Sequence, residues 1–129
     1  YSHNDPATAQ RIITAALAKN KDIVAVFATN LFSAQGVATG IKQAGKAGKV
    51  SVVGFDAGSD QVKALKAGVV QALIAQQPAS IGSQGIEAAV KAIGGGTVSP
   101  HAVKTGFTIL TKKNIDTAAG KKAQYRDAC

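Results

Sequence analysis

The chain has 129 residues, 46% of them hydrophobic, and a formal net charge of +8. This length and apolar content predict one globular domain with a core and exclude a disordered chain. No apolar run approaches the roughly 20 residues of a membrane-spanning helix, since the longest candidate, 23–28, has the length of a strand.

The positive charge does not indicate a nucleic-acid-binding protein. The lysines are scattered over predicted helix ends and loops. This is typical of solvent-exposed helix faces, because a cation near the carboxyl end of a helix interacts favourably with the helix dipole. Lysines are adjacent only at 112–113 and 121–122, and no aromatic platform accompanies them. We therefore expect no nucleic-acid partner. Cys129 is the only cysteine, so no internal disulfide can form and the cysteine count indicates no compartment.

The first half of the chain predicts two helices and two strands. Asp5–Pro6 is a typical helix start, and apolar residues at helical spacing follow it to about Asn20. The segment 23–28 is continuously apolar and contains β-branched residues, which suits a parallel strand buried on both faces. A second helix is predicted over 33–44, and a second strand over 50–55.

The second half continues this alternation. We predict a helix over 59–67 capped by Ser59, a strand over 69–75, a helix from about 79 to 93 and a strand within 103–111. The glycines at 94–96 follow a helix and lack the strand-before, helix-after context of a phosphate loop, so they indicate a plain turn. Residues 117–129 are expected to form a polar tail. Together the elements predict an α/β fold with a mostly parallel sheet and flanking helices.

Polar residues end three successive predicted strands: Asn30, Asp56 and Gln76. Ligands of open parallel sheets bind beyond the carboxyl ends of the strands, so these side chains should share one edge. The two amides can donate and accept hydrogen bonds, and the carboxylate can accept them. This combination suits neighbouring hydroxyl groups of a small ligand. Polar residues also end strands simply because loops begin there, so the pattern alone leaves both interpretations open.

Several short segments, in a fixed order, resemble those of a known family. They are Ala28–Asn30, Gly36, the stretch from Gly45 to Gly54–Phe55–Asp56, and Ile74–Pro78 with Gly82. At these spacings they are similar to the periplasmic sugar-binding proteins of the type I, ribose-binding-protein-like group that serves ABC transporters. The resemblance covers nearly the whole chain, from the first helix to residues 114–116.

The resemblance implies the C-terminal part of a two-lobed periplasmic-binding-protein type I fold. Residues 1–76 would be part of the C-terminal ligand-binding lobe, 77–105 a crossover helix and loop belonging to the N-terminal lobe, and 106–116 the return strand. Asn30, Asp56 and Gln76 would hydrogen-bond ligand hydroxyls in the interlobe cleft. Family members often have an acidic residue after the Asn, where this chain has Leu31–Phe32, so the particular sugar stays open.

The resemblance also implies a function. The chain would belong to the extracytoplasmic solute-binding component of an ABC-type sugar importer, periplasmic or extracellular, and a lipoprotein anchor is compatible with it. Its expected partners are a monosaccharide or related polyol, a membrane permease, and the N-terminal part of the same protein. Because most of one lobe would be missing, the first strand should expose an unpaired apolar edge. We therefore expect these residues to be a fragment or to associate with other material.

Two other functions are compatible with an α/β fold of this kind. The effector-binding domain of a sugar-responsive transcriptional repressor shares the fold and the Gly-Phe-Asp element. In such repressors a Pro-rich segment leading to Leu-Thr-Thr commonly follows, whereas this chain continues to Ala-Gln-Gln-Pro at 75–78, as in the transport proteins. A nucleotide-dependent enzyme on a similar scaffold would need a phosphate loop, and none is found.

No catalytic residue, cofactor or metal site is expected. His3 and His101 have no further ligands at metal spacing, and Cys129 has no evident histidine partner that would activate it as a nucleophile.

Overall fold

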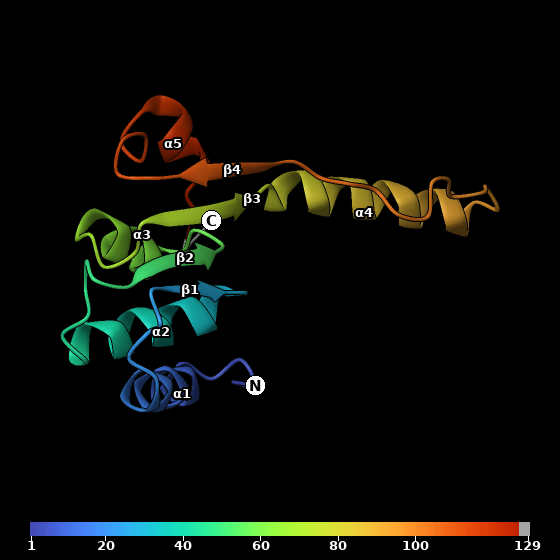
Figure 1. The fold of residues 1–129 in the computed structure, drawn as a ribbon. Helices are drawn as coiled ribbons and strands as arrows, with labels where there is room; N and C mark the ends of the chain where they lie inside the picture. Colours follow the sequence, from blue (N-terminus) through green and yellow to red (C-terminus); the bar gives the residue numbers. More distant parts are fainter. Residues whose placement is uncertain (127–129) are drawn as a thin grey trace. The chain divides into compact units, whose positions relative to one another are not determined.

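The computed structural model describes residues 1–126 of the chain (Figure 1). Two compact units are present: Tyr1–Ala75 together with the segment from Thr108 onward, and Gln76–Phe107. The elements, in chain order, are α1 (Pro6–Lys19), β1 (Ala25–Ala28), α2 (Leu31–Gln43), β2 (Ser51–Phe55), α3 (Ser59–Lys66), β3 (Ala72–Gln76), α4 (Pro78–Ile93), β4 (Phe107–Leu110) and α5 (Ala118–Ala123).

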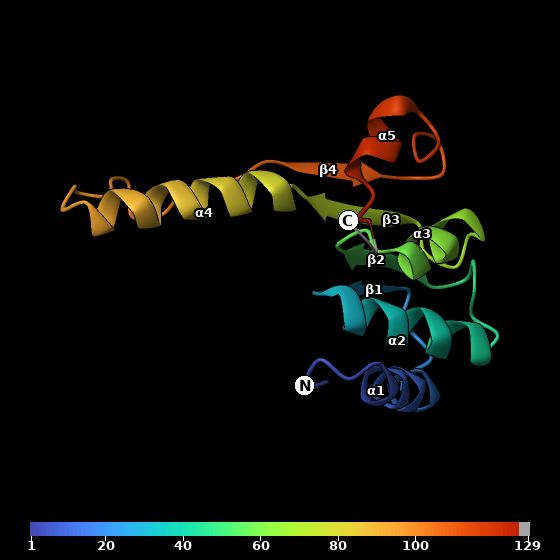
Figure 2. The same ribbon diagram turned by 180° about the vertical axis from the view of Figure 1, so that it is seen from behind.

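The four strands form one sheet in the order β1-β2-β3-β4. β1 and β2 are parallel, with Ala28 opposite Gly54, and β2 and β3 are parallel, with Phe55 opposite Ile74. The arrow of β4 points against that of β3 in both ribbon views (Figures 1 and 2). The predicted α/β class with a mostly parallel sheet is therefore confirmed.

The core of the first unit lies between the sheet and its helices. Helix α2 is central to the packing, because it contacts β1, β2, α1 and α3. The largest fully buried side chains come from both helices and strands: Ile41, Leu65, Leu73, Leu110, Ile115, Gln61, Val52 and Val70. Burial alternates along β2 and β3, as expected for side chains that point to opposite faces of a pleated strand.

The first strand differs from its prediction. The segment 23–28 was expected to be buried on both faces, but Val24 is 72% exposed and Phe27 is 55% exposed. Successive side chains of a strand point to opposite faces, and along β1 Ala25 and Phe27 are exposed while Val26 and Ala28 are not, so only one face of this edge strand is covered. The expectation that the first strand presents an apolar edge describes it better.

Two helix starts also differ from the prediction. Helix α2 begins at Leu31 rather than near Ser33, because Asn30 takes the capping position. Helix α3 is preceded by Gly58 in the capping position, and Ser59 is its first helical residue rather than its cap. No side chain caps the first turn of α3, and the buried Gln61 side chain bonds the capping residue instead, since its oxygen accepts from the Gly58 amide at 2.9 Å. Its nitrogen donates to the Phe55 carbonyl at 2.7 Å.

The segment predicted as a polar tail, 117–129, contains regular structure. Thr117 caps the six-residue helix α5, and Tyr125 packs half-buried against the core. Residues 127–129, including Cys129, lie outside the described part of the chain.

The second unit contains α4 and the chain that follows it to Phe107. None of the residues of α4 is buried, and four of its large apolar side chains, Ile81, Ile86, Val90 and Ile93, are exposed. Among residues 1–126 no helix has both the length and the apolar character needed to cross a membrane.

Candidate functional site

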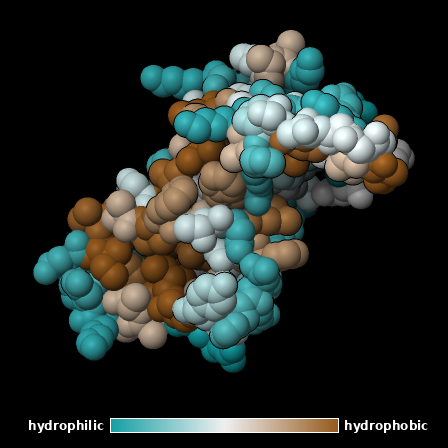
Figure 3. All heavy atoms as spheres, turned by 90° about the vertical axis from the view of Figure 1, so that its right-hand side faces the viewer, coloured by the Kyte–Doolittle hydropathy of each residue, from teal (hydrophilic) through white to brown (hydrophobic). Residues whose placement is uncertain are grey.

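The candidate site is the edge of the sheet at which β1, β2 and β3 end. Because these strands are parallel, their carboxyl ends share that edge. Figure 3 views the molecule from the side to which the arrows of β2 and β3 point, and both hydrophobic and hydrophilic surface is exposed there. Asn30 comes two residues after β1, Asp56 directly follows β2, and Gln76 is the last residue of β3.

Asn30 connects the end of β1 to the start of α2. Its side-chain oxygen accepts from the Ser33 amide at 2.8 Å, which satisfies one of the amides that a helix leaves without an internal partner. Its side-chain nitrogen donates to Oδ1 of Asn4 at 2.6 Å. One side chain therefore both starts α2 and fixes the N-terminal segment at this edge.

Asp56 is held from three directions. Its amide donates to the Ile74 carbonyl of β3 at 2.9 Å. Its Oδ2 atom accepts from the Leu31 amide at 3.1 Å, and its Oδ1 atom accepts from the Tyr125 hydroxyl at 2.9 Å. A carboxylate at the first turn of α2 is favoured by the positive end of the helix dipole.

The backbone of Asp56 adopts the left-handed conformation, with φ at +76°. This region is uncommon for residues other than glycine, although Asp and Asn enter it more readily than most. Such positions cost on the order of 1–3 kcal/mol and concentrate at functional sites. The conformation turns the chain sharply at the end of β2 and presents the carboxylate at the sheet edge.

Of the three predicted residues, the structure brings two together. Asn30 caps α2, and Asp56 binds the amide of Leu31, the next residue along. Gln76 is half-buried and ends its own strand, and it belongs to the second unit.

Two further residues that were not predicted from the sequence also lie at this edge. Asn4 binds Asn30, and it lies in a tight turn in which His3 and Asn4 have φ values of 51° and 58°. An Asn just before the Asp5–Pro6 helix start was an available signal for such a turn. Tyr125 reaches Asp56 across 69 residues of sequence, and no local pattern signals that contact.

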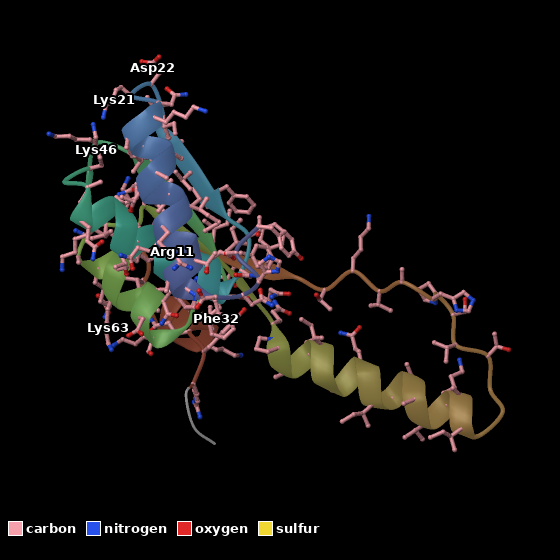
Figure 4. All side chains as sticks on the ribbon, turned by 90° about the horizontal axis from the view of Figure 1, so that it is seen from below. Arg11, Lys21, Asp22, Phe32, Lys46 and Lys63 are labelled. Atoms are coloured by element: carbon pink, nitrogen blue, oxygen red, sulfur yellow. The ribbon has the colours of Figure 1, made fainter. Side chains whose placement is uncertain are left out.

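The charged groups lie mainly elsewhere. Lys21 and Lys46, in the loops that follow α1 and α2, lie at the far end of α2 from Phe32 (Figure 4). The pKa of the Asp60 carboxyl, on α3, is lowered by hydrogen bonds from Lys63 and Gln35. A bond from Lys66 lowers the pKa of Asp116 in the same way. Both aspartates are therefore engaged in surface pairs.

A separate groove of about 630 Å³ runs along α1, α2 and α3. Its lining includes Gln10, Thr39 and Asp60 and none of the three predicted ligand residues. Within residues 1–126 no three His, Cys, Asp or Glu side chains lie together in a way that could hold a metal ion.

The chain matches a family model described as a periplasmic binding protein domain over residues 1–97. The D-allose-binding periplasmic protein of Escherichia coli (strain K12) is 40% identical over 96 residues, which are 74% of this chain and 31% of that protein. The ribose import binding protein RbsB of Haemophilus influenzae is 47% identical over 79 residues, which are 61% of this chain and 26% of that protein. The chain thus spans between a quarter and a third of these curated relatives.

Solved structures agree with the family model. An ABC transporter solute-binding protein from Agrobacterium vitis, bound with α-D-tagatopyranose, superimposes with a TM-score of 0.91 at 38% identity, covering 98% of this chain and 42% of that chain. A second protein from the same organism, with bound D-fucose, gives a TM-score of 0.87 at 35% identity, covering 97% of this chain and 43% of that chain. The chain therefore belongs to the periplasmic binding protein domain family, in the type I, sugar-binding group that its sequence resembles.

Proposed function

We propose that the chain forms one wall of a sugar-binding cleft in the extracytoplasmic solute-binding component of an ABC-type importer. The observation that carries the proposal is the Asp56 carboxylate, fixed on both oxygens at the carboxyl edge of the sheet beside Asn30. The names of the relatives support it, since they are described as D-allose-binding and ribose import binding proteins.

The chemistry of the edge suits a monosaccharide or related polyol. Each sugar hydroxyl both donates and accepts, so it needs acceptors and donors at close spacing. Asp56 supplies a charged acceptor, whose hydrogen bonds are stronger than those between neutral groups. Asn30 and Gln76 supply amide donors and acceptors. The proposed contacts with ligand hydroxyls are those of Asn30, Asp56 and Gln76.

The proposed role is binding without chemical turnover, outside the cytoplasm. Lobe closure about a hinge would convert the bound form into one that a membrane permease recognises. The repressor alternative is not retained, because the relatives matched by this chain are described as binding proteins for import or transport. The relatives hold or are named for several sugars, so the proposal names a ligand class rather than one sugar.

The full-length protein tests the ligand class. Its melting temperature is measured with D-ribose, D-allose, D-tagatose, D-fucose and D-arabinose in turn. A sugar that binds only the folded state raises the midpoint, because it stabilises that state by about 2.7 kcal/mol at a hundredfold excess over Kd. A midpoint that stays constant with every one of these sugars would contradict the proposal.

The sugar that gives the largest shift then tests the site. Asp56→Asn keeps the size of the side chain and the tolerance for positive φ, but it replaces one carboxylate oxygen and removes the charge. We expect the Kd measured by titration calorimetry to rise at least about tenfold, since a hydrogen bond to a charged group contributes about 1.5–3 kcal/mol.

Asp60→Asn is the matched control. Asp60 is an exposed aspartate on α3 that pairs with Lys63 at 3.0 Å. We expect its Kd to stay within about twofold of wild type, since an exposed ion pair contributes little. Equal Kd values for the Asp56→Asn, Asp60→Asn and wild-type proteins would show that Asp56 is not a ligand contact.

A further inference from the structure

The feature that carries a further inference is the contact of Tyr125 with the end of β2. The Tyr125 hydroxyl donates to Oδ1 of Asp56 at 2.9 Å. Its backbone amide donates to the carbonyl of Ala57 at 3.0 Å. One residue near the end of the described chain therefore holds both residues that follow β2.

The segment that brings Tyr125 to this place is itself well anchored. The Thr117 hydroxyl oxygen accepts from the Gly120 amide at 3.1 Å, and the Gln124 side chain donates to the Ile115 carbonyl at 2.8 Å. Gly120 lies so close to the Asn114 carbonyl that a Cβ atom there would clash with it. The path of the chain from 114 to 125 is thus fixed by several independent contacts.

Tyr125 acts on the carboxylate in a specific way. The terminal torsion of an Asp side chain has broad, roughly twofold preferences and is weakly fixed by its own sterics. Here one oxygen accepts from the Leu31 amide and the other from the Tyr125 hydroxyl. Two donors on different oxygens define the plane of the carboxylate. Fixing that plane also fixes the directions from which a ligand hydroxyl can donate to the carboxylate.

We propose that Tyr125 is a positioning residue, which holds the Asp56 carboxylate in the orientation that receives the hydroxyl groups of the sugar. This inference rests on the proposed function. A group oriented before the ligand arrives loses less rotational freedom on binding, and affinity rises accordingly. The C-terminal segment thereby takes part in binding through the hydrogen bond from Tyr125 to Asp56.

The test uses Tyr125→Phe in the full-length protein, with the sugar found in the screen above. The variant keeps the ring that packs against the core and removes only the hydroxyl. We expect a Kd about three- to tenfold higher than that of wild type. The effect is smaller than that of removing a ligand contact, because the lost hydrogen bond joins Tyr125 to Asp56 and not to the sugar. Thr39→Val, which removes an exposed hydroxyl on α2 bonded to the Gln35 carbonyl, should leave the Kd unchanged.

A second background separates positioning from a general structural role. Asp56→Gly removes the carboxylate and tolerates the positive φ at this position. If Tyr125 acts through Asp56, its hydroxyl has no carboxylate to orient in the Asp56→Gly protein. Adding Tyr125→Phe to Asp56→Gly should then change the Kd by less than about twofold. The weaker binding of the Asp56→Gly proteins is followed by NMR titration at high sugar concentration.

Each outcome bears on the proposal. An unchanged Kd for Tyr125→Phe, or the same loss in both backgrounds, would overturn the positioning role while leaving the proposed function intact. A Tyr125→Phe protein that no longer folds would assign the residue a structural role and also overturn it. Absence of sugar binding by the wild-type protein would overturn this inference together with the proposed function.

Discussion

At the scale of single residues, Asn30 has two tasks that mutation can separate. Its oxygen caps α2, and its nitrogen binds Asn4. A loss of ligand affinity in an Asn30 variant therefore has two physical sources, a destabilised helix start and a missing amide. A useful replacement at Asn30 changes either the helix cap or the amide group, and leaves the other as it is.

We predict different stabilities for Asn30→Ala and Asn30→Ser. The alanine variant loses the bond to the Ser33 amide, and loss of such a cap typically costs about 1 kcal/mol of the free energy of unfolding. Serine is itself a preferred cap, so Asn30→Ser should stay within a few tenths of a kcal/mol of wild type. Urea unfolding of both variants measures the difference. Equal midpoints for the two would show that the cap contributes nothing.

At the scale of elements, the close approach of α1 and α2 places Asn4 next to Asn30. A Cβ atom at Gly36 would meet the Pro6 carbonyl oxygen, and it would lie 2.6 Å from Cβ of Ala9. Only glycine at this position of α2 lets the backbones come so near. The packing of α1 on α2 thus brings the N-terminal turn to the sheet edge at which Asn30 lies.

We predict that Gly36→Ala lowers the free energy of unfolding by about 1–3 kcal/mol, the usual cost of overpacking, despite the higher helix propensity of alanine. Gly82→Ala is the matched control on α4, where a new Cβ atom would have no atom within 4 Å. That variant should be neutral or stabilising by up to about 1 kcal/mol. Gly36→Ala as stable as wild type in urea would show that the two helices can separate at little cost.

The elements also show what local sequence patterns can predict. The start of α1 is confirmed, because Asp5 caps it through the Thr8 amide at 2.7 Å as the Asp-Pro pair indicates. The strand over 51–55 likewise follows from a run of apolar residues. Helix α5 was missed, because six residues rich in Ala, Gly and Lys carry no apolar periodicity.

The candidate site was predictable only in part. Asn30, Asp56 and Gln76 follow from the rule that polar residues at strand ends meet at one edge. The bond from Tyr125 to Asp56 depends on how β4 and α5 return to the sheet, and no local pattern encodes a contact over 69 residues. The start of α3 was misplaced by one residue, because Gly58 rather than Ser59 is the capping residue. The buried Gln61 bonds to Gly58 and to Phe55, both within six residues of it, so this start was encoded locally in a Gly-x-x-Gln spacing.

At the scale of the whole molecule, the chain spans between a quarter and a third of its curated relatives and about two fifths of the solved structures that it matches. Large apolar side chains are exposed on β1 and along α4, for example Phe27 and Ile93. Contact with another part of the protein or with another protein would remove them from water. In the proposed function this chain forms one wall of the cleft, so sugar binding is measured on the full-length protein.

The most direct test of the central claim is a crystal structure of the full-length protein with its sugar bound. The account predicts an oxygen of the Asp56 carboxylate at about 2.7 Å from a ligand hydroxyl, as in a strong O–H···O bond, with the Tyr125 hydroxyl still on Oδ1. A sugar bound in the groove along α1, α2 and α3, or one that touches no atom of Asp56, would contradict it.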